Sequence, residues 1–170
     1  MIANYTLYDM MVAPFITRFK ALDGILAKLE THIEQHKLKD ETFLNDRLYP
    51  DMFPFATQVR IATDMTKGAV ARLSGVEVPK FEDTETTVAQ LRTRVQALIA
   101  FLGTLNSAQF EGVEDKEIHI KWPSGKEFFF TGLSFVNDSA LPQVYFHLTA
   151  AYSILRHRGV VIGKADFLGA

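Results

Sequence analysis

The chain has 170 residues, of which 48% are apolar and 22% are charged, and its formal net charge is −2. This length suits a single domain over residues 1–170, large enough to bury a core without a metal or a disulfide. The near-neutral charge gives no electrostatic reason to expect nucleic-acid binding, and the absence of cysteine excludes disulfides, thiol nucleophiles and cysteine-based metal sites.

The N-terminal residues do not resemble a targeting segment. They include Asp9 and lack both a basic stretch and a small-residue cleavage site. The longest purely apolar runs are far shorter than the roughly 18–20 residues that span a bilayer. The sequence therefore predicts a cytoplasmic protein without a membrane partner.

The first helix is expected between residues 5 and 36, where apolar residues recur at intervals of three and four. Pro14 lies inside this pattern and should either kink the helix or mark its true start. The polar stretch 32–46 is expected to be a loop. Its length would allow a crossover connection to the second helix.

The second helix is expected to begin near residues 52–54 and to end at Ser74 and Gly75, which form an ordinary C-terminal signal. Asp51 would be placed to cap this helix. The proline-containing stretch before it is either only a stiff turn or part of a pocket, into which Tyr49 and Gln58 would face.

Asp64 lies further along the second helix, between two apolar residues. A carboxylate there needs solvent or a cation. The candidate cations are Arg60, Lys67, Arg72 and Arg156.

The second half of the chain predicts a third helix, a hairpin and a last helix. Thr87 and Gln90 fit a capping box for the third helix, although Asp83 or Thr84 would also serve as its start. Alternating residues on either side of a Pro/Gly turn predict a β-hairpin over 116–131. The last helix ends at Gly159, and the tail 160–170 is expected to be extended and ordered. Together these elements predict an all-α four-helix bundle with a small hairpin between its third and fourth helices.

The sequence contains no phosphate-binding glycine motif, no HExxH, no GxSxG and no paired Glu-x-x-His for a di-iron site. His32 and His36 have the spacing of a helical metal pair, but a solvated helix end explains them better. His119 is expected on the exposed face of the hairpin. His157 is expected at a helix C-terminus, where a cationic side chain interacts favourably with the helix dipole.

His147 is different, because it lies in an apolar stretch of the last helix. A buried imidazole needs partners for both ring nitrogens. His147 is therefore either a hydrogen-bonded core residue or a ligand-binding or acid–base group.

Four segments together resemble the DUF1993 family of uncharacterised bacterial proteins, which belongs to the DinB/YfiT-like superfamily of metalloenzymes. They are LYPDMFP at 48–54, ARLSGVEVP at 71–79, YFHLTAAYSILRHRG at 145–159 and IGKADFLG at 162–169. The resemblance covers nearly the whole chain. It implies a bundle with a crossover connection, often dimeric, and relatives that are thiol-dependent transferases and hydrolases of small molecules.

The resemblance also implies a metal site at one open end of the bundle, made by one histidine of the second helix and two of the last. Here His147 matches one ligand, but Ala151 and Gln143 stand four residues to either side. The second helix has no histidine, and its only candidates are Asp51, Gln58, Thr63 and Asp64. The metal triad looks lost, so no metal ligand is assigned and a divalent metal is not expected.

Three functions follow from these observations, and whether the protein is an enzyme stays open. The first is a small-molecule pocket in which His147 acts as a general base or hydrogen-bond anchor. The second is a non-enzymatic homodimer that uses the apolar run 128–130 and the tail. The third is a metal-dependent hydrolase or thiol transferase with non-standard ligands. The residues expected around His147 in the pocket are Tyr49, Asp51, Gln58, Asp64, Tyr145 and Ala151.

Overall fold

The computed structural model describes residues 5–122 and 124–170 and is mostly helical, with one two-stranded antiparallel hairpin. The all-α class and the hairpin are confirmed. The long helices are α1 (Ala13–His36), α3 (Phe55–Ser74), α4 (Val88–Leu102) and α6 (Leu141–His157). The short elements are η1 (Tyr8–Val12), α2 (Asp40–Leu44), η2 (Ser107–Phe110), β1 (Ile118–Lys121), β2 (Glu127–Phe130), α5 (Gly132–Phe135), η3 (Val136–Ala140) and α7 (Lys164–Leu168).

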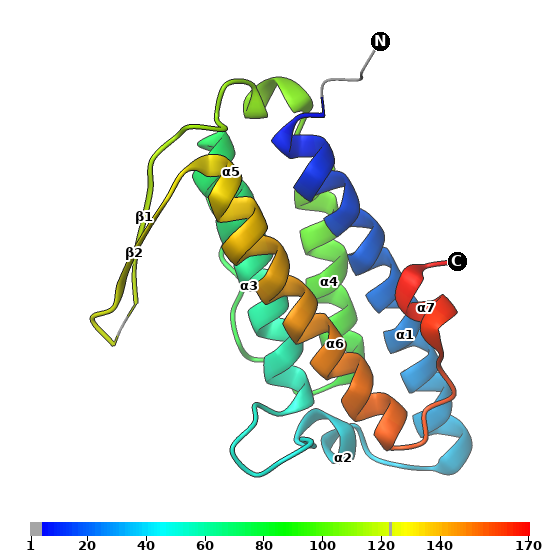
Figure 1. The fold of residues 1–170 in the computed structure, drawn as a ribbon. Coiled ribbons are helices and arrows are strands. Elements are labelled where there is room, and N and C mark those ends of the chain that lie inside the picture. The colour runs from blue at the N-terminus through cyan, green and yellow to red at the C-terminus, as the bar shows by residue number, and fades with distance from the viewer. Residues whose placement is uncertain (1–4, 123) are drawn as a thin grey trace.

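The long helices lie as two packed pairs, α1 with α4 and α3 with α6 (Figure 1). Helices α3 and α4 run in the same direction. The ion pair between Arg60, near the start of α3, and Glu85, just before α4, shows that the two helices start side by side. Residues 75–87 therefore return along α3 before α4 begins. The long connection follows α3, whereas the sequence suggested a crossover after α1.

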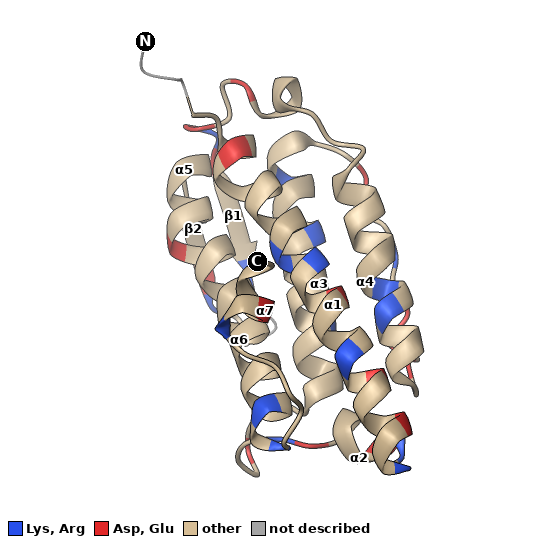
Figure 2. Ribbon diagram, turned by 90° about the vertical axis from the view of Figure 1, so that its right-hand side faces the viewer, with Lys and Arg blue, Asp and Glu red and all other residues tan. Residues whose placement is uncertain are grey.

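Charged residues of both signs occur along α1, whereas the charged residues of α4 are the arginines Arg92 and Arg94 (Figure 2). Arg92 of α4 bridges Asp23 and Glu30 of α1, with N–O distances of 3.0 and 2.6 Å. This pairing fixes the antiparallel register of the two helices at their solvent-facing edge.

The segment after α1 is not simply the predicted loop. It contains α2, because Phe43 and Leu44 are buried in the core and need a helical turn to reach it together. The prediction that His32 to Asp46 forms only a loop is therefore wrong. His32 and His36 belong to the last turns of α1.

The starts of the long helices agree only in part with the capping signals in the sequence. Thr87 and Gln90 form the predicted capping box of α4. Asp51 does not cap α3: the N-cap is Pro54, which has no side-chain cap bond, and the N–H of Phe55 instead donates to the carbonyl of Asp46 at 2.8 Å. Pro14 lies in the first turn of α1, directly after the π-helical turn η1.

The hairpin lies along one side of the helices and projects from them (Figure 1). Ile118 pairs with Phe130, and His119 pairs with Phe129. Ile118 is buried and Phe130 packs against Phe135 of α5, whereas His119 stacks on the exposed Phe129 on the other face. Pro123 of the predicted turn lies outside the described residues.

The tail is ordered, but it is not extended as predicted. It ends in α7, which begins where the carboxylate of Asp166 accepts the N–H of Gly163 at 2.8 Å. The guanidinium of Arg18 donates to the carbonyl of Phe167 at 2.7 Å and so holds the other end of α7 against α1.

In the described part of the chain, none of the helices combines the length and the apolar character that crossing a membrane requires.

Candidate functional site

The side chains of Gln58 and His147 meet between α3 and α6. Nδ1 of His147 lies 2.7 Å from Oε1 of Gln58. Nε2 of Gln58 donates to the carbonyl of Phe53 at 3.0 Å, and only 1% of Gln58 is exposed. The pair therefore links the last helix to the turn that precedes α3.

This arrangement determines which ring nitrogen of His147 carries the proton. The Phe53 carbonyl can only accept, so the amide group of Gln58 must face it and Oε1 must face His147. Nδ1–H is then the donor, and the neutral imidazole keeps its lone pair on Nε2. Nε2 has no protein partner among the described residues and is not enclosed.

Partial burial lowers the pKa of His147 below the ordinary histidine value. Desolvation is the cause, because it disfavours the charged imidazolium. The ring of Phe146 stands edge-on to the imidazole, with the ring centres 5.2 Å apart. The neutral ring, with a free lone pair, is thus the favoured form near pH 7.

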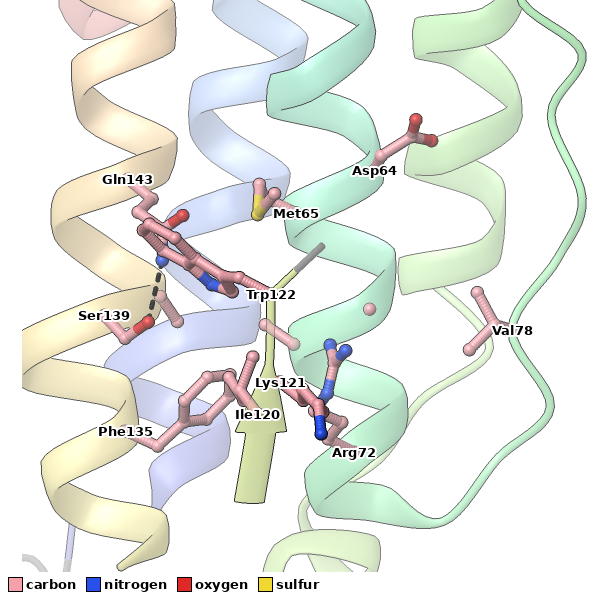
Figure 3. Close-up of a pocket in the computed structure, with 13 residues that line it drawn as sticks. Asp64, Met65, Arg72, Val78, Ile120, Lys121, Trp122, Phe135, Ser139 and Gln143 are labelled. Atoms are coloured by element: carbon pink, nitrogen blue, oxygen red, sulfur yellow. Dashed lines mark hydrogen bonds between the residues drawn. The ribbon is translucent and has the colours of Figure 1, made fainter. Parts of the chain in front are cut away.

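A cavity of about 460 Å³ lies between α3, the η3–α6 segment and the hairpin (Figure 3). Its volume falls in the range of small-molecule sites, roughly 300–1,000 Å³. Trp122 lies across it from the hairpin side, close to Met65 and Gln143. Most of the lining is apolar, with charged side chains contributed by Asp64, Arg72 and Lys121.

The cavity and the Gln58–His147 pair lie along the same two helices, and we call the strip that contains both the α3–α6 groove. Neither Gln58 nor His147 lines the cavity itself. Gln58, Met65 and Arg72 are seven residues apart and so share one face of α3, and Gln143 is one turn before His147 on α6. Met65, Arg72 and Gln143 line the cavity. Its edge is therefore about 6 Å along α6 from the imidazole.

Of the residues predicted to surround His147, only Gln58 contacts it through a hydrogen bond. Tyr49 is 66% exposed and Asp51 is also exposed, so the expectation that Tyr49 faces inward is wrong. The backbone turns at 49–52 and leaves both side chains on the surface. Tyr145 is half-buried outside the cavity lining, and Ala151 is fully buried in the core.

Asp64 does reach the cavity, and it has two cationic partners. Lys67, one of the predicted cations, lies 2.9 Å from its Oδ1, and Arg94 of α4 lies 2.8 Å away. Arg94 is 3% exposed at its side chain and also binds Asp83 and Glu85. The sequence did not reveal this buried arginine, because nothing local distinguishes it from the more exposed Arg92 of the same helix.

Trp122, Arg72 and Gln143 were missed as lining residues. The chain has one tryptophan, and it directly follows a strand that alternates apolar and polar residues. That alternation places Trp122 on the face of Ile120, which was the available signal that it turns toward the helices.

The residues at the superfamily's metal positions do not fit a metal triad. Oε1 of Gln58 already accepts the His147 bond, and Ala151 offers no donor atom. Within residues 5–122 and 124–170, no cluster of three or more His, Cys, Asp or Glu side chains could hold a metal ion.

Comparison with known proteins gives a family and a structural relative. A family model described as a domain of unknown function, DUF1993, matches residues 7–168. The crystal structure of a DinB family member protein from Shewanella denitrificans is similar, with 41% sequence identity and a TM-score of 0.88 over 96% of this chain and 92% of that chain. No curated protein matches the chain.

Proposed function

The chain belongs to the DUF1993 family and is DinB-like; from that premise we propose that it is a four-helix bundle with a crossover connection that binds a small organic molecule in the α3–α6 groove. His147 contacts that molecule through Nε2, as a hydrogen-bond anchor or as a general base. The site works without the metal triad of the superfamily.

One observation carries this proposal: the bond from Nδ1–H of His147 to Gln58 orients the imidazole and leaves Nε2 without a protein partner among the described residues. A general base needs an unprotonated nitrogen within reach of its proton donor. When Nε2 takes a proton, Oε1 of Gln58 stabilises the resulting charge through Nδ1–H. The lowered pKa of His147 keeps the base in its reactive form near neutral pH.

The proposal is tested with 4-nitrophenol, an aromatic ring that carries a single acidic O–H. Its binding can be followed by quenching of Trp122, the one tryptophan of the chain, which lines the cavity. We expect saturable quenching in the unmodified protein. We expect His147→Ala to weaken binding about tenfold, which corresponds to one lost hydrogen bond of about 1.4 kcal/mol.

His157→Ala is the matched control, since His157 is an exposed residue of the same helix and lies outside the groove. It should leave the affinity unchanged, and circular dichroism should show that both variants keep their helix content. Equal affinity in the unmodified protein and His147→Ala would exclude His147 as the contact group.

A homodimer without catalytic activity is the second candidate function. Phe129 on the outer face of the hairpin is 74% exposed, and Phe146 on α6 is 61% exposed. Large exposed aromatic residues are typical of association surfaces. We expect a dimer mass by light scattering and a monomer mass for Phe129→Ser. A strict monomer in the unmodified protein would dismiss this candidate.

A further inference from the structure

The charged residues around the cavity do not contribute equally to the electrostatic potential inside it, because some of them are paired with opposite charges. Asp64 belongs to a network in which the carboxylates of Asp64, Asp83 and Glu85 face the cations of Arg60, Lys67 and Arg94. Three negative charges meet three positive ones. This side of the cavity is therefore electrically balanced, and Asp64 is not free to bind a cationic ligand.

Lys121 is also paired. Its Nζ lies 2.9 Å from Oε1 of Glu127, its cross-strand partner in the hairpin. Glu127 accepts a second bond from His119 at 3.1 Å. The hairpin thus neutralises Lys121 at the point where it reaches the cavity.

Arg72 is the exception among the charged lining residues. No carboxylate of the described chain lies within ion-pair distance of its guanidinium. The side chain lies back along α3 over Gly68, where a Cβ would stand 2.9 Å from Nη1. The absence of a side chain at Gly68 lets the guanidinium lie against the helix at the cavity (Figure 3).

The remaining lining of the cavity is mostly apolar. Trp122, Met65 and Ile120 line it together with Phe135. Trp122 is supported from behind by Phe128, with the ring centres 4.8 Å apart. A planar ring or a short hydrocarbon would contact these side chains, and Trp122 offers a face on which an aromatic ring can stack.

From this combination we infer that the ligand is a small amphipathic carboxylate, whose anionic group is bound by Arg72 and whose apolar body packs against Trp122. The inference rests on the proposed function and names the ligand class of that same groove. An unpaired guanidinium beside an apolar wall recognises a carboxylate through two parallel N–H···O bonds. Neutral and cationic molecules of the same shape lack this contact.

The test compares 4-nitrobenzoate with its neutral analogue 4-nitrobenzamide, again by quenching of Trp122. We expect the carboxylate to bind at least tenfold more tightly than the amide, and this preference should weaken with added salt. Arg72→Gln should bring the two affinities within twofold and leave the affinity for the amide unchanged. Arg72→Lys should keep part of the preference.

Lys121→Gln is the matched control, because it removes a lining cation that already has a carboxylate partner. It should retain most of the preference for the carboxylate. Equal binding of the two probes to the unmodified protein, or a preference that survives Arg72→Gln, overturns the inference. If the carboxylate preference is absent but 4-nitrophenol still binds in a His147-dependent manner, the inference about Arg72 falls and the proposed function stands. If none of the three probes gives saturable quenching, both fall.

Discussion

Replacing Arg94 by alanine is expected to lower the free energy of unfolding by about 3 kcal/mol, the lower end of the range for breaking a buried ion pair. The buried carboxylate of Glu85 loses one of its two cations and keeps only Arg60. Nη1 of Arg94 lies 2.9 Å from Glu85, and Nη2 lies 2.8 Å from Asp64. Its Nε donates to Oγ1 of Thr63 at 2.7 Å. Urea unfolding followed by circular dichroism at pH 7 measures the loss.

Arg92→Ala is the matched control for this prediction. Arg92 lies two residues earlier on α4 and also bridges two carboxylates, but its side chain is 28% exposed, against 3% for Arg94. Water replaces its contacts, so we expect a loss of less than about 1 kcal/mol. Similar losses in the two variants would contradict the view that burial makes Arg94 important.

The pH dependence of stability provides a second measurement of the same network. Burial alone would raise the pKa of Glu85, but its own backbone N–H and the bonds from Arg60 and Arg94 outweigh burial and lower it. The stabilisation is therefore present above the pKa of Glu85 in the unfolded chain, and it is lost as the pH falls through the lower folded value. Arg94→Ala should flatten this acid branch.

Replacing Gly132 by alanine is expected to destabilise the fold by about 1–3 kcal/mol, the usual effect of overfilling a packed position. A Cβ at residue 132 would overlap the carbonyl oxygen of Val113 and lie 3.3 Å from that of Glu114. The N–H of Leu133 binds the Glu114 carbonyl at 2.8 Å, so the two backbones cannot separate freely. Thermal unfolding and the fluorescence of Trp122 would report the loss and the shift of the hairpin.

Gly24→Ala makes the same chemical change without the steric conflict. Gly24 lies inside α1, and a Cβ added there would meet no atom of another element within 4 Å. Alanine is the better helix former there, so we expect a gain of about 0.5–1 kcal/mol. If Gly132→Ala also increased the stability, the backbone at Val113 would have to move aside at little cost, and the prediction would be wrong.

The long helices could be predicted from sequence because each buries a stripe that local spacing already displays. The capping box at Thr87 and the hairpin were predictable for the same reason, since each depends on neighbours within a few residues. His147 also stood out in the sequence, as a polar residue in an apolar stretch.

The partners of these residues could not be predicted. Gln58 lies 89 residues before His147, and Arg94 lies 30 residues after Asp64. Each pairing depends on which helices run side by side, and the course of residues 75–87 between α3 and α4 decides that. The cavity was harder still to predict, because its lining forms only where the hairpin lies over α3 and η3.

The π-helical turn η3 (Val136–Ala140) separates the two ends of the groove along the chain. A π turn contains one residue more than an α turn, and one residue corresponds to about 100° of rotation. Loss of one residue from η3 would turn α5 and the attached hairpin about the helix axis while His147 stayed opposite Gln58. The hairpin wall of the cavity and the imidazole of His147 are therefore positioned by different segments of the chain.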